Sequence, residues 1–190
     1  IKNLLISKNT KAFKSDYPDY SITRKIENSG AEKKYNVVLV IIESMSSNFL
    51  HSFGNQENLT PNLDSLAKQG LLYTNLYATG TRTVRGLEAI TLSIPPLPGQ
   101  SIIKRPKNED LDFCISKVIS TKGYELKFIY GGFGYFDNMN YFFENNGFKT
   151  IDRADMKSDE ITFSNAWGVC DEDLFNKSIN EANISAAQNK

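Results

Sequence analysis

Histidine and cysteine are scarce in this chain, which has one histidine and two cysteines among its 190 residues. Two cysteines cannot build a disulfide framework, and the spacing of Cys114 and Cys170 fits no metal-binding motif. Two buried free thiols are therefore expected, although the sequence leaves open whether the two could pair. The single histidine, His51, falls in a predicted loop, where a surface position is expected rather than a metal ligand.

An excess of charge of either sign is also missing, because 22 lysines and arginines balance 22 aspartates and glutamates. This balance gives no bulk electrostatic argument for nucleic acid, and we expect no nucleic-acid partner. No apolar run reaches the roughly 18 residues of a membrane span. The hydrophobic fraction of 40% and the aromatic fraction of 12% instead predict a folded core.

Strand and helix patterns alternate along most of the chain. Residues 36–42 form a continuous, largely β-branched apolar run, which is typical of a strand covered on both faces of a parallel sheet. The other predicted strands are residues 71–77, 125–130 and 148–151. Residues 1–34 are polar and broken by turn residues, so they are predicted to form an N-terminal arm or linker before a domain at 35–190.

Helix signals separate these strands. Thr60 is the expected N-cap of a helix that has Pro61 in its first position and Gly70 after its end. Thr83 or a near neighbour opens the next helix, and the remaining predicted helices cover 111–121, 138–146 and 171–190. The alternation predicts an α/β fold of three layers, α/β/α, with a mostly parallel sheet.

Polar residues follow three of the predicted strands. Glu43, the segment 80–83 and the segment 131–138 each come directly after a strand, and ligands of parallel sheets bind at the carboxyl ends of the strands. We therefore expect these residues at one edge of the sheet. A carboxylate such as Glu43 and a hydroxyl at a helix start could share one metal ion, whereas the alternative for Glu43 alone is a solvated residue outside the sheet.

Thr83 is the candidate nucleophile, and its hydroxyl would need activation, which a metal can supply. The alternative is that Thr81 or Thr83 only caps the helix that follows. Arg82 and Arg85 are suited to bidentate contacts with phosphate or sulfate oxygens, and their alternative is ion pairing at the surface, for example with Glu88.

The glycine-rich segment 131–138 offers backbone and side-chain polar groups, including those of Asp137 and Asn138, to a ligand. Its alternative is a tight turn from a strand into a helix, with its aromatic residues packed in the core. The segment lacks the GxGxxG spacing and is no dinucleotide-binding fingerprint.

Three segments together resemble a known family: the strand and acid at 36–44, the Thr-Pro-Asn-Leu-Asp-Ser-Leu-Ala pattern at 60–67 with Gly70 after it, and Gly-Thr-Arg-Thr at 80–83. They are similar to the sulfatase-like branch of the alkaline phosphatase superfamily. Within that branch, the chain most resembles the lipoteichoic acid synthase and phosphoglycerol transferase group. The resemblance extends from about residue 36 to residue 175.

The resemblance implies an alkaline phosphatase-like fold and a divalent metal, Mn, Mg or Zn. The metal would lie between a glutamate, a nucleophilic threonine and an Asp-His pair. Glu43 matches the glutamate, and Thr83 matches the second threonine of a Gly-Thr-x-Thr pattern. A sulfatase-like alignment would place Thr81 at the nucleophile and Arg85 at the arginine. Thr83 then stands where sulfatases have proline, which favours transfer through a phospho-threonine intermediate.

Two departures from the family pattern limit what is expected of this chain. No Asp-His pair occurs in the 190 residues, so we expect the N-terminal, incomplete part of a catalytic domain that is inactive alone. The segment 135–139 also lacks the tryptophan and arginine with which the family contacts glycerol phosphate. The departure leaves the acceptor and head-group preference open. The residues expected at the substrate are Arg82, Arg85, Asp137 and Asn138.

The resemblance implies a transferase that moves a phospholipid head group to a glycan or lipid acceptor. The enzyme would be anchored in the bacterial cytoplasmic membrane by an N-terminal transmembrane region. Because the chain opens on Ile1 and not on Met, we expect that this region has been removed. Its catalytic domain would face the periplasm or the cell exterior. The alternatives are a sulfatase or phosphodiesterase on the same fold, and a non-catalytic binding domain of the cell envelope.

Overall fold

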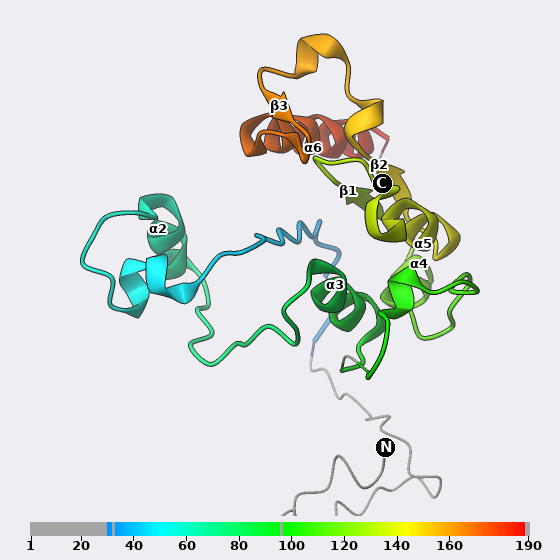
Figure 1. Ribbon diagram of the computed structural model, residues 1–190, viewed down its shortest axis with the longest axis horizontal. Coiled ribbons are helices and arrows are strands. Elements are labelled where there is room, and N and C mark those ends of the chain that lie inside the picture. Colours follow the sequence, from blue (N-terminus) through cyan, green and yellow to red (C-terminus); the bar gives the residue numbers. More distant parts are fainter. Residues whose placement is uncertain (1–29, 32, 96, 189–190) are drawn as a thin grey trace, which may run out of the picture. The chain divides into compact units, whose positions relative to one another are not determined.

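The computed structural model describes residues 30, 31, 33–95 and 97–188 (Figure 1). Contacts within the chain define two units, residues 1–41 and 42–190, which are described separately. Most of the predicted N-terminal arm, residues 1–29 and 32, lies outside the described residues. The described residues of the first unit contain no helix or strand, and the boundary predicted at residue 34 stays a prediction.

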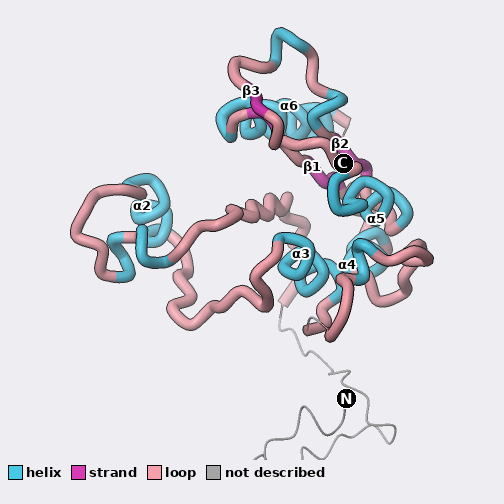
Figure 2. The backbone as a smooth tube through the Cα atoms, in the orientation of Figure 1, coloured by secondary structure: helices cyan, strands magenta, loops and turns pink. Residues whose placement is uncertain are grey.

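Two of the four predicted strands are wrong. Residues 36–42 and 71–77 have no strand hydrogen bonding and run as loop in Figure 2. Their apolar side chains are open to solvent, with Val37 81% and Leu71 77% exposed. A strand is held by the hydrogen bonds of a neighbouring strand, and among the described residues no strand pairs with either segment.

The other two predicted strands are confirmed, although both are shorter than expected. Strands β1 (Lys127–Ile129) and β2 (Lys149–Ile151) pair in parallel, with Lys127 opposite Lys149 and Ile129 opposite Ile151. Helix α5 (Met139–Asn145) lies between them in the sequence and supplies the crossover that parallel pairing requires. The molecule therefore has an α/β fold. The described residues show two strands of its parallel sheet.

Four further helices accompany this unit in the described residues. Helix α2 (Pro61–Gln69) begins and ends as predicted, and α3 (Thr83–Leu92) begins at the predicted Thr83. Helix α4 (Ile115–Ser120) covers only the second half of the predicted helix at 111–121, and α6 (Asp171–Ala187) lies within the predicted C-terminal helix. The sequence did not predict the short antiparallel hairpin of β3 (Ser164–Asn165) and β4 (Gly168–Val169).

Short 3₁₀ helices occupy several of the connections. They are η1 (Ser47–Phe49), η2 (His51–Phe53), η3 (Ile102–Lys104), η4 (Phe136–Asn138), η5 (Arg153–Asp155) and η6 (Ser158–Glu160). Two of them, η3 and η4, contact one another and carry residues of the candidate site.

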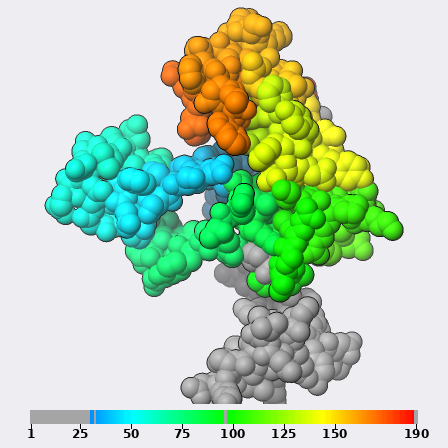
Figure 3. Space-filling view, viewed as in Figure 1, coloured from blue at the N-terminus to red at the C-terminus, as the bar shows by residue number. Residues whose placement is uncertain are grey.

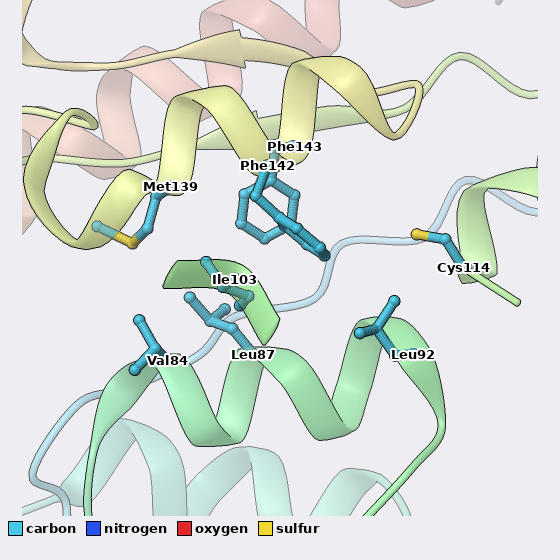
Figure 4. Packing of buried hydrophobic residues seen from close by; sticks show 8 residues of the cluster. All are labelled: Val84, Leu87, Leu92, Ile103, Cys114, Met139, Phe142 and Phe143. Atoms are coloured by element: carbon cyan, nitrogen blue, oxygen red, sulfur yellow. The ribbon is translucent and has the colours of Figure 1, made fainter. Parts of the chain in front are cut away.

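The hydrophobic core lies between α3 and α5. Figure 4 shows side chains of the two helices pointing toward one another, with Ile103 of η3 between them. The core consists of Val84, Leu87, Leu92, Ile103, Cys114, Met139, Phe142 and Phe143. Phe143 also stacks on Phe128 of β1, with 3.7 Å between ring centroids, so the same core joins α3 to the sheet.

Ion pairs fix α6 against β1. The ammonium of Lys127 lies 3.0 Å from Glu181 Oε2 and also donates to the Glu181 carbonyl at 3.1 Å. The two side chains are only 12% and 10% exposed, so solvent screens this pair weakly. A second lysine of α6, Lys177, pairs with Glu160 of η6 at 3.2 Å.

Replacing Lys127 tests this attachment. Lys127→Ala leaves the nearly buried Glu181 carboxylate without its main partner. We expect the free energy of unfolding to fall by about 2 kcal/mol, the scale of hydrogen bonds to charged groups. The control is Lys117→Ala, which removes an exposed pair with Asp110 and should change the free energy of unfolding by less than about 0.5 kcal/mol. Urea unfolding measures both, and equal effects would contradict the prediction.

Candidate functional site

Thr83 and Glu43 form the centre of the candidate site. The Thr83 hydroxyl donates a hydrogen bond to Glu43 Oε1 at 2.6 Å, across 40 residues of sequence. Glu43 lies in an exposed turn just after the apolar run 36–42, and Thr83 is the first residue of α3. The structure thus brings together the two residues that the sequence assigned to one metal. A bond of this length is typical of a hydroxyl held by an ionised carboxylate.

Helix α3 holds the Thr83 hydroxyl in place. Its buried face packs into the core, and Arg82, in extended conformation, forms its N-cap. The Arg82 carbonyl accepts from the backbone N–H of Arg85 at 2.9 Å, which closes the first turn. Thr83 therefore lies where free N–H groups and the helix dipole favour an anion.

The two predicted arginines are placed differently. Arg85 is bound within the chain, because its Nη1 lies 3.1 Å from Oε2 of the fully buried Glu88 and its Nη2 donates to the Gly99 carbonyl. The ion pair with Glu88, foreseen as the alternative role of Arg85, is therefore present. Arg82 is exposed, and within the described part of the chain its side chain makes no hydrogen bond or ion pair.

Asp137 and Asn138 are attached to η3. The Asp137 carboxylate pairs with the ammonium of Lys104, and Asn138 Nδ2 donates to the Ile103 carbonyl at 3.1 Å. Both residues have left-handed backbones, with φ of 53° and 62°. Lys104 is thus a cation beside the candidate site.

Tyr130 connects the two halves of the candidate site, which are the pair Glu43 and Thr83 and the pair Asp137 and Asn138. Burial raises the pKa of its phenol above the usual value, and the negative charges of Glu43 and Asp137 raise it further. The phenol therefore lies within electrostatic range of both carboxylates and stays protonated at neutral pH. Sequence reasoning did not select Tyr130. The available signal was its position at the end of the predicted strand 125–130.

The glycine-rich segment after β1 forms a tight turn that uses its own backbone groups. Asp152, directly after β2, accepts hydrogen bonds from the Gly134 N–H at 2.8 Å and from Asn140 Nδ2 at 2.7 Å. The Gly131 carbonyl accepts from the Val169 N–H at 2.9 Å. These backbone groups bind within the chain, which agrees with the alternative of a strand-to-helix turn, although its aromatic residues are largely exposed.

Asp64 of α2 organises the segment before that helix. Its carboxylate is buried and accepts from the Ser52 hydroxyl at 2.6 Å, the Ser52 N–H at 2.8 Å and the Thr60 hydroxyl at 2.9 Å. These hydrogen bonds hold the pKa of Asp64 well below its usual range, and the two from Ser52 have the largest effect. The His51 N–H joins them at 3.2 Å, while the His51 side chain is exposed, as expected.

Comparison with known proteins shows the family of the chain. The family model described as Sulfatase matches residues 35–190, which is most of the chain. The chain belongs to the sulfatase family. It is also similar to a crystal structure described as a protein in the alkaline phosphatase superfamily from Vibrio parahaemolyticus, with 42% sequence identity and a TM-score of 0.63. That match covers 68% of this chain and 31% of the Vibrio chain, so this sulfatase-family chain spans about a third of its relative.

Membership of this family makes the protein part of a group of hydrolases and transferases, whose enzymes generally use divalent metals. The Glu43 carboxylate and the Thr83 hydroxyl fit such an ion as two hard oxygen ligands. Across residues 30–188, apart from 32 and 96, no group of three or more His, Cys, Asp or Glu side chains could hold a metal. The same residues include no helix long and apolar enough to cross a bilayer.

The charge of Glu43 can be measured through Tyr130. Glu43→Gln removes one negative charge that disfavours the phenolate, so the pKa of Tyr130 should fall toward its usual value. The neutral phenol contributes stability below the unfolded pKa near 10, and this is lost as the pH rises through the raised folded pKa. Alkaline titration followed by NMR of ring-labelled tyrosine measures the shift, with Tyr130→Phe assigning the signal.

The control for this titration is Glu109→Gln. Tyr141 donates to Glu109, and this bond raises the pKa of Tyr141. Glu109→Gln should therefore lower the pKa of Tyr141 and leave that of Tyr130 unchanged. An unchanged Tyr130 titration in Glu43→Gln would contradict the arrangement of Glu43 and Tyr130.

Proposed function

We propose that this chain contributes the nucleophile of a metal-dependent phosphoglycerol transferase of the bacterial cell envelope. The observation that carries the proposal is the 2.6 Å hydrogen bond from the Thr83 hydroxyl to Glu43 at the start of α3. A threonine hydroxyl is a weak nucleophile, and a carboxylate that accepts its proton orients the oxygen for attack. Membership of the sulfatase family supports group transfer at such a site.

The proposed reaction has two steps. Thr83 Oγ1 attacks the phosphorus of a phospholipid head group and forms a phospho-threonine. The bond between this phosphorus and the lipid oxygen breaks, and the lipid alcohol leaves with the proton from the Thr83 hydroxyl. An acceptor hydroxyl, from a glycan or a lipid, then attacks the phospho-threonine and releases Thr83. A bound divalent ion, Mn, Mg or Zn, would have Glu43 and Thr83 among its ligands and would lower the pKa of the hydroxyl.

The surrounding residues have separate roles in this proposal. Arg82, whose exposed side chain has no partner among the described residues, is available to a phosphoryl oxygen. Arg85 is engaged with Glu88 and Gly99, so its proposed contribution is to hold the first turn of α3. Asp137 and Asn138 would contact the head group, together with Lys104, the partner of Asp137.

The proposed setting follows from the substrate. A phospholipid head group is accessible only at a membrane surface, so we propose a catalytic domain outside the bacterial cytoplasmic membrane that is anchored by a segment outside these residues. The acceptor is proposed to be a glycan or a lipid of the envelope. An Asp-His pair would complete the metal site, and the 190 residues contain none.

Replacement of Thr83 tests the nucleophile in the whole protein. Thr83→Ala should reduce transfer from phosphatidylglycerol by at least about 1,000-fold, because loss of a nucleophile removes the covalent route. Thr81→Ala is the matched control, since this exposed hydroxyl lies two residues away and has no hydrogen-bond partner in the described residues. The opposite result, an active Thr83→Ala and an inactive Thr81→Ala, would assign the nucleophile to Thr81.

The rival function is hydrolysis of a sulfate ester or phosphodiester, because the family includes hydrolases as well as transferases. Parallel assays of the whole protein with an aryl sulfate, a simple phosphodiester and phosphatidylglycerol separate these reactions. Turnover of the sulfate ester with no transfer from phosphatidylglycerol would replace the proposal.

The 190-residue chain alone should be inactive. It has a glutamate and a threonine for the metal but no Asp-His pair, so we expect weak binding of Mn²⁺ or Zn²⁺ and no phosphodiester turnover. Isothermal titration and the assay above measure these properties against the whole protein. Tight metal binding with turnover by this chain would overturn the assignment of the missing ligands.

A further inference from the structure

A group of exposed aromatic rings lies beside the candidate site and has no role in the proposed chemistry. Phe133 is 38% exposed, Tyr135 78%, Phe136 49% and Trp167 76%. The first three follow β1, and Trp167 lies in the turn between β3 and β4. We call these four residues the aromatic platform. Large apolar rings gathered at a surface mark an interaction site more often than isolated ones do.

The rings of the platform form two pairs. Phe133 and Tyr135 are stacked, with 5.7 Å between centroids and planes 24° apart. Phe136 and Trp167 meet edge to face at 6.2 Å and 87°. The hairpin that carries Trp167, drawn in orange in Figure 3, thus lies against the yellow-green segment after β1.

The backbone under Trp167 is held closely. A Cβ at Gly132 would lie 2.6 Å from the Trp167 carbonyl, so only glycine allows this approach. Gly168 has a φ of 147°, and a Cβ there would lie 2.3 Å from the Gly131 carbonyl. Asn165 Oδ1 accepts from the Trp167 N–H at 2.8 Å. The indole is therefore presented on a preformed support, which lowers the entropy lost when a ligand binds.

The hairpin is also anchored from its other side. Asp173 of α6 is buried and accepts hydrogen bonds from the Thr162 N–H at 2.8 Å and the Thr162 hydroxyl at 2.9 Å. The segment that carries Trp167 is thus tied to α6 as well as to the turn after β1.

The platform has almost no charge of its own. Residues 130–136 and 161–170 contain no Asp, Glu, Lys or Arg, and the polar groups beside the rings include the amide of Asn165 and the hydroxyl of Ser164. Attachment to an anionic lipid surface or to a nucleic acid depends on lysine and arginine, which these segments lack. A neutral ligand with one apolar face and many hydroxyls complements these surfaces.

We propose that the aromatic platform binds neutral hexopyranose rings of a glycan. The axial C–H bonds of a pyranose stack on an aromatic face, and its hydroxyls can bond the nearby amide and hydroxyl groups. Phe136 directly precedes Asp137, so a bound sugar would lie next to the candidate head-group contacts. As the acceptor subsite of the transferase, this inference rests on the proposed function, whereas sugar binding can be measured without any transfer.

Trp167 is the only tryptophan of the chain, so its fluorescence reports directly on the platform. The 190-residue protein is titrated with neutral hexasaccharides of glucose, one β-linked and one α-linked. We expect a saturable shift of the emission to shorter wavelength and protection from acrylamide quenching with at least one of them. No saturable change with either would overturn the proposal.

Variants locate the binding by isothermal titration. Trp167→Ala and Phe136→Ala should each weaken hexasaccharide binding at least tenfold, whereas Trp167→Phe should retain part of it. Phe113→Ala is the matched control, because Phe113 is 52% exposed and has no ring contact with the platform among the described residues. Circular dichroism confirms that each variant is folded. Equal losses in Phe113→Ala and Trp167→Ala would place the sugar elsewhere.

Two other occupants are tested in the same experiment. A spectral shift with phosphatidylglycerol vesicles but not with sugars would mean a membrane surface and would overturn the proposal. A spectral shift that depends on protein concentration would mean that a second copy of the chain covers the platform, and this would also overturn the proposal. If sugar binds at Trp167 but Thr83→Ala retains transfer, the proposed function fails and the platform stands. If Thr83→Ala loses transfer but the protein binds no sugar, the proposed function stands and the proposal for the platform fails.

Discussion

The packing of α3 against α5 is the constraint on which the candidate site depends. Leu87 of α3, Ile103 of η3 and Phe142 of α5 meet in one buried cluster. Burying side chains of this size contributes roughly 1.5–3 kcal/mol each, more than a typical exposed ion pair contributes. The start of α3 carries Thr83, and η3 holds Asp137 and Asn138, so both halves of the candidate site are attached to this cluster.

Local signals predicted the elements that local interactions stabilise. Pro61 and Gly70 marked both ends of α2, and the hydroxyl-rich turn at 80–83 marked the start of α3, because caps and prolines act within one turn of a helix. The segments 36–42 and 71–77 were predicted as strands from local sequence pattern, which for 36–42 is a largely β-branched apolar run. A strand depends on partners that can be distant in sequence, and the described residues provide none for these two.

The proximity of Glu43 and Thr83 could be predicted from the sequence, whereas most other contacts of the candidate site could not. The sequence paired Glu43 with Thr83, and the structure places them in a hydrogen bond. It could not show that Arg85 is engaged by Glu88 and Gly99 while Arg82 is not, because that depends on which arginine side chain reaches the Gly99 carbonyl. Tyr130 and Lys104 were missed for a similar reason, since Tyr130 is influenced by Glu43 and Lys104 pairs with Asp137, each more than 30 residues away in the sequence.

The left-handed backbones of Asp137 and Asn138 have a consequence for the substitutions that this turn tolerates. Two adjacent residues with positive φ admit aspartate, asparagine or glycine with little strain and disfavour β-branched side chains. Selection on the turn alone would therefore retain aspartate, asparagine or glycine here, whatever the ligand. Asp137→Asn keeps the permitted backbone and removes the charge that pairs with Lys104, so genetics can separate the demands of folding from those of recognition.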